Sequence, residues 1–357
     1  MQEDARKSPA VTLATKVARL SETLAAECHD TVFRQVHFTR PKSSGELVQL
    51  QEADIQILRE TEVLVCENTF VRLFPSFVKY VPKLKWMHYN VAGIDSIFKA
   101  WEGECPPHFI ITRSPGFSGI EMADYVIGHV IARERKFKEM ARCQEDCIWN
   151  TEFCNFRRVS ELTIGILGVG DIGSQIAKQC KNHGMTVWGL VKHEHLIRER
   201  TSHVDVYKFS AELEQLLAEC DYICNVLPST SSTRGLLSGK MLSACAKKVE
   251  KLSEKTGQDY LIEKSVFINI GRGDIIDEES IVSAIRNGWI SAAILDVLPV
   301  EPLPATSQLW KMPEVTITPH MATCFHVPFI CQRFKDNYQK FVRGEEMNHV
   351  VSWQSEY

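Results

Sequence analysis

The strongest constraint on the fold is the segment Leu162–Val191, which reads LTIGILGVGDIGSQIAKQCKNHGMTVWGLV. The apolar run Ile164–Leu167 suits a buried parallel strand, and Met185–Val191 is a second apolar run. Between them lie a glycine-rich turn and apolar residues at helical spacing. Strand, glycine turn, helix and strand in this order are what a dinucleotide-binding fingerprint requires, so the segment predicts a Rossmann-type unit.

Each glycine of the turn has an expected role. Gly168 allows the tight turn, Gly170 lets a pyrophosphate approach the backbone, and Gly173 lets the helix sit close to the sheet. The N-terminus of the helix then offers unpaired N–H groups and the positive end of its dipole to the phosphates.

The composition limits the class of protein. With 357 residues the chain is long enough for two domains. It is 44% apolar and 24% charged, with a net charge of −4, so neither nucleic acid nor a membrane is expected as a partner. No apolar run approaches the roughly 20 residues that span a bilayer. Since the N-terminus also lacks the apolar core of a signal peptide, a cytoplasmic location is expected.

The twelve cysteines are scattered, and several fall inside apolar runs. Examples are Cys66, Cys180, Cys220 and Cys224. Buried free thiols in a reducing compartment are the simplest interpretation. A metal site formed by Cys143, Cys147 and Cys154 is the alternative, but no CxxC motif or paired histidine spacing supports it, and no metal is expected.

Strand and helix patterns alternate along the rest of the chain, which predicts an α/β protein with two parallel sheets. We expect a first domain over residues 1–124, completed by residues 321–357, and a doubly wound dinucleotide-binding domain over residues 125–320. The last helix, Val327–Val342, has one wide apolar face that should dock on the first domain. A helix that begins near Ser118, with Glu121 in a capping box, should cross between the domains, and Arg133–Arg142 should be its solvated continuation.

Four residues that suit acid–base and anion chemistry follow predicted strands of the second domain. Arg272 lies between glycines in INIGRGD, Asp296 and Glu301 lie in LDVLPVEP, and His320 lies in TPH. Ligands bind at the carboxyl ends of the strands in such sheets. Together these residues predict a cationic anchor, a histidine that moves a proton, and the carboxylate that orients it. Taken singly, each is as readily structural or solvated.

The chain resembles the D-isomer-specific 2-hydroxyacid dehydrogenase family over almost its full length. The segments that carry the resemblance are LKWMHYNVAGID, MADYVIGHVIARER, GILGVGDIG, NVLPSTSSTRGLL, INIGRGDIIDEESIV, ILDVLPVEPLP and ITPHMAT. The resemblance implies a Rossmann-type domain joined to a flavodoxin-like substrate domain. It also implies an oxidoreductase that reduces a small 2-oxo acid, similar to glyoxylate or hydroxypyruvate, with NAD(P)H. A homodimer is the family expectation, with the helix near Ala123–Arg133 as the contact.

Roles follow from the resemblance residue by residue. Arg272 matches the arginine that binds the substrate carboxylate and keto oxygen, His320 the general acid/base, and Glu301 its carboxylate partner. Ala92 and Gly93, in a turn just past a strand, match the backbone cradle of the substrate carboxylate, although the residues alone indicate only a turn. The residues that match cofactor contacts are Gly168, Gly170, Asp171, Ile172, Gly173, Val191, Lys192, Leu227, Pro228, Thr233, Ile270, Gly271 and Asp296.

Two departures from the family pattern stand out. Family members that prefer NAD carry an acidic residue at the end of the second strand of the fingerprint, where this chain has Val191 followed by Lys192. This favours NADP over NAD, since Lys192 suits a 2′-phosphate; a merely solvated lysine is the alternative. The second departure is the polar run Lys247–Lys264, which looks like an insertion of unassigned role.

Two other functions are compatible with the fold. Relatives with this fold act as corepressors that sense dinucleotide and bind peptides, and such a protein would keep all the site residues. A formate-type dehydrogenase fits less well, because Glu301 is the histidine partner typical of hydroxyacid enzymes. The sequence does not identify the 2-oxo acid.

Overall fold

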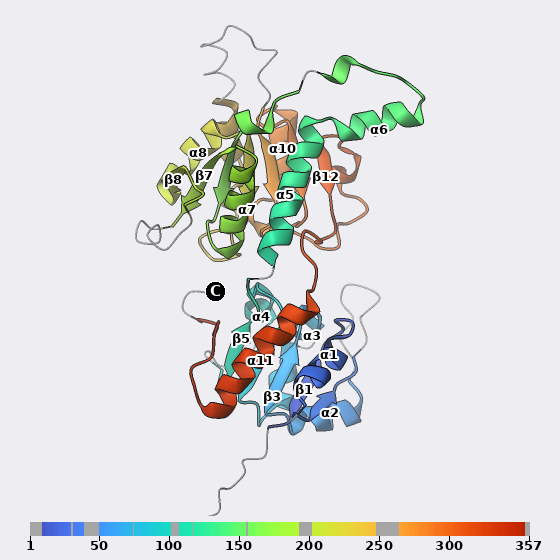
Figure 1. The fold of residues 1–357 in the computed structure, drawn as a ribbon, viewed down its shortest axis with the longest axis vertical. Helices are drawn as coiled ribbons and strands as arrows, with labels where there is room; N and C mark the ends of the chain where they lie inside the picture. Colours follow the sequence, from blue (N-terminus) through green and yellow to red (C-terminus); the bar gives the residue numbers. More distant parts are fainter. Residues whose placement is uncertain are drawn as a thin grey trace, which may run out of the picture. The chain divides into compact units, whose positions relative to one another are not determined.

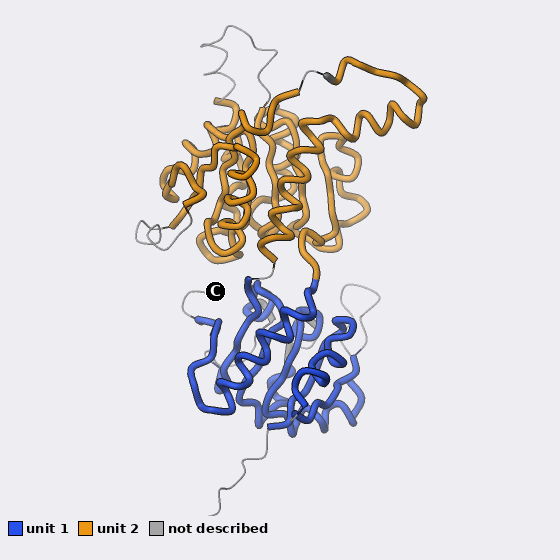
Figure 2. The backbone as a smooth tube through the Cα atoms, viewed as in Figure 1, with its two compact units in different colours: residues 1–117, 325–357 blue, residues 118–324 orange. Residues whose placement is uncertain are grey.

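The computed structural model describes residues 9–29, 31–38, 50–73, 75–100, 107–116, 118–154, 156–192, 202–247 and 264–353. The chain forms two compact units: unit 1 comprises residues 1–117 and 325–357, and unit 2 comprises residues 118–324 (Figure 2). Among the described residues, no helix is long and apolar enough to cross a membrane.

Unit 1 contains a five-stranded parallel sheet in the order β2-β1-β3-β4-β5 (Figure 1). Its strands are β1 (Val11–Ala14), β2 (Phe33–Gln35), β3 (Val63–Cys66), β4 (Trp86–Tyr89) and β5 (Ile110–Arg113). Its α-helices are α1 (Leu20–Glu27), α2 (Glu52–Arg59), α3 (Asn68–Leu73), α4 (Asp95–Ala100) and α11 (Val327–Arg343), and Pro75–Tyr80 is a 3₁₀ helix. This strand order is the flavodoxin-like one, as the family resemblance implied.

The C-terminal helix α11 docks on unit 1 as its apolar face predicted. Phe334 is fully buried and stacks on Trp86 of β4, with ring centroids 5.4 Å apart and planes 5° apart. Ile330 and Cys331 enter the same core cluster, which also includes Val11 of β1. The helix ends at Gly344, whose φ of 71° gives the left-handed cap that favours glycine.

Unit 2 contains a seven-stranded parallel sheet in the order β12-β11-β10-β9-β6-β7-β8. Its strands are β6 (Thr163–Leu167), β7 (Thr186–Val191), β8 (Val206–Phe209), β9 (Tyr222–Asn225), β10 (Val266–Asn269), β11 (Ala292–Leu295) and β12 (Val315–Ile317). Numbered from β6, this is the Rossmann order 3-2-1-4-5-6 with one further edge strand. The predicted fold class, a doubly wound sheet with a second α/β domain, is confirmed.

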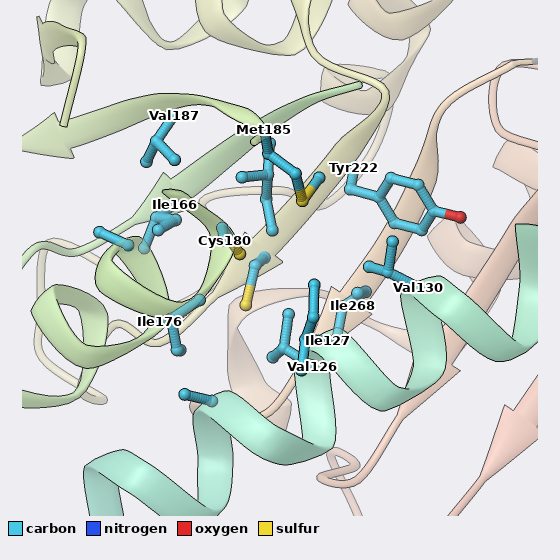
Figure 3. Packing of buried hydrophobic residues seen from close by; sticks show 14 of the residues in the cluster. Val126, Ile127, Val130, Ile166, Ile176, Cys180, Met185, Val187, Tyr222 and Ile268 are labelled. Carbon is cyan, nitrogen blue, oxygen red and sulfur yellow. The ribbon is translucent and has the colours of Figure 1, made fainter. Parts of the chain in front are cut away.

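Helices cover both faces of the unit 2 sheet. The α-helices of unit 2 are α5 (Ser118–Glu134), α6 (Phe137–Glu145), α7 (Asp171–Asn182), α8 (Leu213–Glu219) and α10 (Glu278–Arg286), with 3₁₀ helices at Glu152–Cys154, Val159–Glu161, Ser210–Glu212, Met241–Cys245, Gly273–Ile275 and Gln308–Lys311. Val126, Ile127 and Val130 of α5 pack with Ile176 and Cys180 of α7 on one face of the sheet (Figure 3). The helices α8 and α10 cover the other face.

The helix α5 belongs wholly to unit 2, although the sequence pattern suggested that it crosses between domains. The units divide just before Ser118 because the apolar face of α5 packs against α7 and the sheet. On the C-terminal side the division follows Cys324, since the Thr323 hydroxyl and the Cys324 N–H donate to the Glu121 carboxylate of α5. The expected bounds, 124/125 and 320/321, fall inside this packed region.

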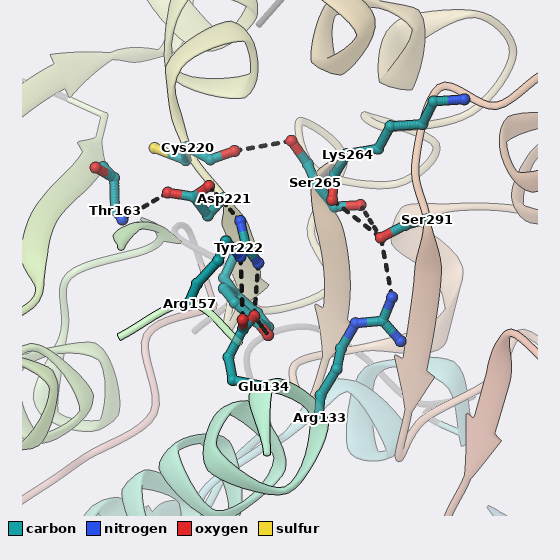
Figure 4. Close-up of polar contacts among 10 residues, drawn as sticks. All are labelled: Arg133, Glu134, Arg157, Thr163, Cys220, Asp221, Tyr222, Lys264, Ser265 and Ser291. Carbon is teal, nitrogen blue, oxygen red and sulfur yellow. Dashed lines mark hydrogen bonds and ion pairs between the residues drawn. The ribbon is translucent and has the colours of Figure 1, made fainter. Parts of the chain in front are cut away.

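The expected solvated continuation of α5 is exposed over α6, which buries no residue, but Glu134 at the end of α5 is buried. Glu134 is only 2% exposed and accepts hydrogen bonds from Arg157 and from the Tyr222 hydroxyl (Figure 4). Arg157 also pairs with Asp221, 2.9 Å away. The chain then leaves the helix at Lys136, whose φ is 56°, and the separate helix α6 begins. Glu134 is buried because it lies on the face of α5 that meets the sheet, where a cation compensates its charge.

Candidate active site

The glycine turn of the fingerprint connects β6 to α7 at the carboxyl edge of the unit 2 sheet. Gly168 has a φ of 100°, which an L side chain rarely adopts. A Cβ at Gly173 would lie 2.1 Å from the Gly168 carbonyl oxygen, so a side chain is excluded where the helix meets the strand. A Cβ at Gly170 would meet nothing within 4 Å, which leaves open space at the start of the 12-residue helix α7. These residues therefore fit a dinucleotide pyrophosphate.

Val191 and Lys192 lie where the sequence placed them, at the end of β7. Val191 is 4% exposed and packs in the core cluster, and Lys192 is exposed. Residues 193–201, including His193, lie outside the described part of the chain, as do residues 248–263 of the Lys247–Lys264 run.

The predicted histidine–carboxylate pair forms directly. His320 Nδ1 lies 2.8 Å from Glu301 Oε2, and the second carboxylate oxygen of Glu301 accepts from the Leu298 N–H at 3.0 Å. The histidine ring is about half exposed, and its backbone φ of 53° is unusual for a non-glycine residue. With Nδ1 turned to Glu301, Nε2 is the ring atom left to exchange a proton with a substrate.

Asp296 organises the loop that carries His320. It is 3% exposed, and its carboxylate accepts from the Thr318 hydroxyl (2.6 Å), the Met321 N–H (2.7 Å) and the Ala322 N–H (3.0 Å). Its backbone carbonyl also accepts from the His320 N–H. These contacts fix the path of the chain on both sides of the histidine, which in turn fixes where the ring stands.

Arg272 follows β10 and is held through its backbone. The Arg272 carbonyl accepts from the Asn269 side chain at 3.1 Å, and Asn269 Oδ1 accepts from Asn225 at 2.8 Å and from the Gly271 N–H at 3.3 Å. Asn225 also accepts from the Leu227 N–H. A Cβ at Gly271 would lie 2.7 Å from the Asn225 amide nitrogen, so the two strand ends close on each other only because this residue is a glycine.

Sequence reasoning missed the buried pair Asn225 and Asn269. Both are the last residue of their strand, in YICN and VFIN, and both are at most 1% exposed. An asparagine as the last residue of an apolar strand was the available signal. Tyr125 was missed as well: its hydroxyl lies 2.8 Å from the Thr318 hydroxyl, and burial raises its pKa to about 12.

Topology brings most of the predicted residues to one edge. Because all seven strands are parallel, the segments after β6, β9, β10, β11 and β12 lie along the same carboxyl edge. These segments carry Gly168–Gly173, Leu227 and Pro228, Ile270–Arg272, Asp296 with Glu301, and His320. Thr233 closes the turn after β9, since its hydroxyl donates to the Pro228 carbonyl.

Ala92 and Gly93 lie in unit 1, in the turn between β4 and α4. Arg113 Nη1 donates to the Ala92 carbonyl at 3.0 Å, so the carbonyl side of this turn is engaged by the last residue of β5. The turn follows a strand end of the parallel sheet, as the sequence indicated.

A doubly wound sheet with a glycine turn and a histidine–glutamate pair at its carboxyl edge defines a dinucleotide-dependent oxidoreductase. The model of the family "D-isomer specific 2-hydroxyacid dehydrogenase, NAD binding domain" matches residues 127–322, which is more than half of the chain. The chain belongs to this family and is an NAD(P)-dependent 2-hydroxyacid dehydrogenase.

Individual relatives agree with this assignment. The glyoxylate/hydroxypyruvate reductase A of Klebsiella pneumoniae (strain 342) is 27% identical over 278 residues, in an alignment that covers 74% of this chain and 80% of the relative. The D-isomer specific 2-hydroxyacid dehydrogenase of Xanthobacter autotrophicus Py2, solved with NADPH and MES, is 25% identical with a TM-score of 0.77, covering 98% of this chain and 100% of that one. The NADPH-dependent glyoxylate/hydroxypyruvate reductase of Sinorhizobium meliloti, at 20% identity, shares the fold with a TM-score of 0.77, over 98% of this chain and 100% of that one.

Proposed function

We propose that the protein reduces a small 2-oxo acid, similar to glyoxylate or hydroxypyruvate, to the D-2-hydroxy acid. The observation that carries this proposal is the His320–Glu301 contact, with Glu301 anchored on the Leu298 N–H. When bound, NAD(P)H supplies the hydride. Protonated His320 donates from Nε2 to the keto oxygen, and Glu301 holds the ring and stabilises its charge. Arg272 presents its guanidinium to the substrate carboxylate and keto oxygen.

The proposal extends to the binding residues. We infer that the backbone N–H groups of Ala92 and Gly93 bind the substrate carboxylate. The cofactor residues would be those of the glycine turn and the neighbouring strand ends, namely Gly168, Gly170, Asp171, Ile172, Gly173, Leu227, Pro228, Thr233, Ile270 and Gly271. Asp296 has three of its lone-pair positions occupied, which leaves room for one more donor such as the nicotinamide carboxamide.

The test of the reaction is substrate turnover. His320→Ala should lower kcat by a factor on the order of 10²–10⁴ because proton transfer is lost. Arg272→Ala should lose most turnover as well, and both variants should still bind cofactor. His183→Ala, an exposed histidine of unit 2, is the matched control. A His320→Ala enzyme with a near-native rate would refute the assignment.

We propose NADP as the preferred cofactor. Lys192 is exposed and directly follows the buried Val191, so the strand end offers a cation and no carboxylate to a 2′-phosphate. The NADPH bound to the Xanthobacter relative supports this choice. Lys192→Ser should raise the Kd for NADPH about tenfold and leave NADH binding unchanged, whereas Lys178→Ser, an exposed control on α7, should change neither. Tighter binding of NADH than NADPH by the wild type would overturn the choice.

We also propose a homodimer, with the arm formed by α6 and residues 146–149 as the contact, rather than α5. The face of α5 that includes Ala123 is buried in unit 2, whereas α6 buries no residue. Exposed apolar side chains gather on the arm: Phe137 (53% exposed), Met140 (40%), Ile148 (55%) and Trp149 (95%). Sedimentation analysis should show a dimer. The double variant Trp149→Ser/Phe137→Ser should shift the equilibrium towards the monomer.

The free, buried cysteines support the expected cytoplasmic location.

A further inference from the structure

Unit 1 has an unusual cluster of polar side chains where three neighbouring strands end. In the register of the sheet, Ala14 of β1 pairs with Cys66 of β3, and Cys66 pairs with Tyr89 of β4. The next residues, Thr15, Glu67 and Asn90, therefore follow side by side along the carboxyl edge. All three are buried, with 7%, 2% and 0% exposure.

This cluster has few internal partners. Glu67 Oε2 accepts from the Thr15 hydroxyl at 2.8 Å, but Glu67 Oε1 has no partner among the described residues. The amide nitrogen and oxygen of Asn90 also have no hydrogen-bond partner within the described ranges. The same holds for the amide oxygen of Asn68, the first residue of α3. In the part of the chain that the structure describes, eight buried polar side-chain atoms have no partner, and four of the eight belong to Glu67, Asn68 and Asn90.

The neighbouring polar groups of the same sheet are paired. The Tyr89 hydroxyl lies 2.7 Å from the Ser96 hydroxyl, and His88 contacts Thr112 and Ser114 at 3.0 Å each. Among the other described residues of unit 1, only Gln35 on the edge strand β2 and Arg333 on α11 have an unpartnered buried atom, one each, so such atoms are concentrated in the cluster of Glu67, Asn68 and Asn90. Since native proteins pair nearly all buried polar atoms, such a concentration indicates a place for a bound group.

The atoms define the chemistry of that group. Three of the four are acceptors, one of them on a carboxylate with no cation paired to it in the described residues, and only Asn90 Nδ2 is a donor. A buried carboxylate favours a positive partner, and an ammonium group carries three donors and no acceptor.

We propose that Glu67, with Asn68 and Asn90, forms a subsite for a protonated amine at the far end of the substrate side chain. This rests on the proposed function for the other end of the ligand, since Ala92 and Gly93 follow Asn90 by two and three residues. The preferred substrate class is thus a 2-oxo acid with an amino group on its side chain, and Glu67 is the residue that selects it.

The test is a binding series on the full chain without cofactor, measured by calorimetry. The probes are the D-isomers of 4-amino-2-hydroxybutanoate, 2,4-dihydroxybutanoate and 2-hydroxypentanoate, which end in ammonium, hydroxyl and methyl, together with the same series one carbon longer. The ammonium ligand should bind at least about tenfold more tightly than the methyl ligand, at one length or both, because a carboxylate–ammonium contact replaces an apolar one. The hydroxyl ligand should lie between them.

Glu67→Gln should bring the ratio of the two Kd values close to one, and Asn90→Leu should reduce it. The ratio does not depend on the fraction of folded protein, so a destabilised variant still gives an answer. Glu62→Gln, at the residue just before the same strand, where the side chain is 38% exposed and paired with Lys85, should leave the ratio unchanged. Equal Kd values at both lengths, hydroxyl binding as tight as ammonium binding, or a ratio unaffected by Glu67→Gln would overturn the proposal.

Oxidation of the same ligands with NADP⁺ or NAD⁺ separates this inference from the proposed function. A preference for the amine in binding without any turnover would refute the proposed reaction and leave the subsite standing. Turnover without a preference for the amine in binding would refute the subsite and leave the proposed reaction standing.

Discussion

The carboxyl edges of the two sheets differ in how their polar side chains are paired. At the edge of unit 2, Asn225, Asn269 and Asp296 are buried and bonded to backbone and side-chain groups of the segments that carry Leu227, Arg272 and His320. At the edge of unit 1, Glu67 and Asn90 are as deeply buried but have unpartnered atoms within the described residues. Both edges are formed by parallel strands with polar residues at their ends.

The difference teaches what each edge is built for. A fully bonded polar set fixes loops in one arrangement before any ligand arrives, which is what a site for hydride and proton transfer needs. A set with unpartnered acceptors costs stability in the free protein and is relieved only when a ligand supplies donors. The same contrast between bonded and unpartnered buried groups predicts different losses of stability on mutation.

The largest effect is expected at the paired buried carboxylate Glu134. Arg157→Met leaves Glu134 and Asp221 buried without their cation, so the free energy of unfolding should fall by about 3–5 kcal/mol. Urea unfolding measures this. Arg158→Met removes the exposed Arg158–Glu161 pair next to it and should cost less than about 1 kcal/mol. Similar losses in both variants would show that the buried network is not what stabilises this end of α5.

Exchanging one asparagine at each edge compares the two directly. Asn269→Leu removes the hydrogen bonds that Asn269 makes to the Asn225 amide, the Gly271 N–H and the Arg272 carbonyl. The free energy of unfolding should therefore fall by about 3 kcal/mol or more. Asn90→Leu removes two unpartnered polar atoms at nearly constant volume, so the free energy of unfolding should stay constant or rise by about 1 kcal/mol. Equal destabilisation in the two variants would mean that Asn90 has structural partners and that the contrast is wrong.

The smallest expected effect is a pH dependence in unit 1. Burial lowers the pKa of His88 to about 3, from an ordinary value of 6.5. Below pH 6.5 the unfolded chain takes up a proton that the folded chain refuses until about pH 3, so stability is full above pH 6.5 and declines as the pH falls.

Between pH 7 and pH 5 this histidine should account for about 2 kcal/mol of lost stability. His88→Gln should remove that part of the pH dependence of urea unfolding, and His183→Gln, an exposed histidine, should not. If His88→Gln has the same pH profile as the wild type, His88 is protonated in the folded chain.

Much of the fold follows from the order of residues. The run Asp277–Arg286 predicts a helix with Asp277 as its N-cap, and the Asp277 carboxylate accepts from the Ser280 N–H at the start of α10. The wide apolar face of 327–342 was expected to dock on the first domain, and Phe334 lies against Trp86 there. These features depend on local periodicity and capping, which neighbouring residues determine. The family resemblance likewise predicts the contact of His320 with Glu301.

Other features depend on which residues meet across the sheet. Glu134 looked solvated like the residues after it, because nothing in MADYVIGHVIARER shows that Arg157 and Tyr222 will lie beside it. The pairing of Asn225 with Asn269 joins residues 44 positions apart in the chain. Spacing and periodicity carry no information about such distant neighbours.

The order of residues alone indicates the class of protein, through a glycine turn between strand and helix and through Arg272, Glu301 and His320 after strands of one parallel sheet. These follow from local backbone geometry and from the rule that parallel strands end at the same edge. Which buried polar atoms have partners becomes visible only in the folded chain, because pairing depends on strand register and on side chains from distant segments. For this reason Asn269 and Asn90 differ although both lie at strand ends: the Asn269 side chain is hydrogen-bonded, and the Asn90 side chain has no partner among the described residues.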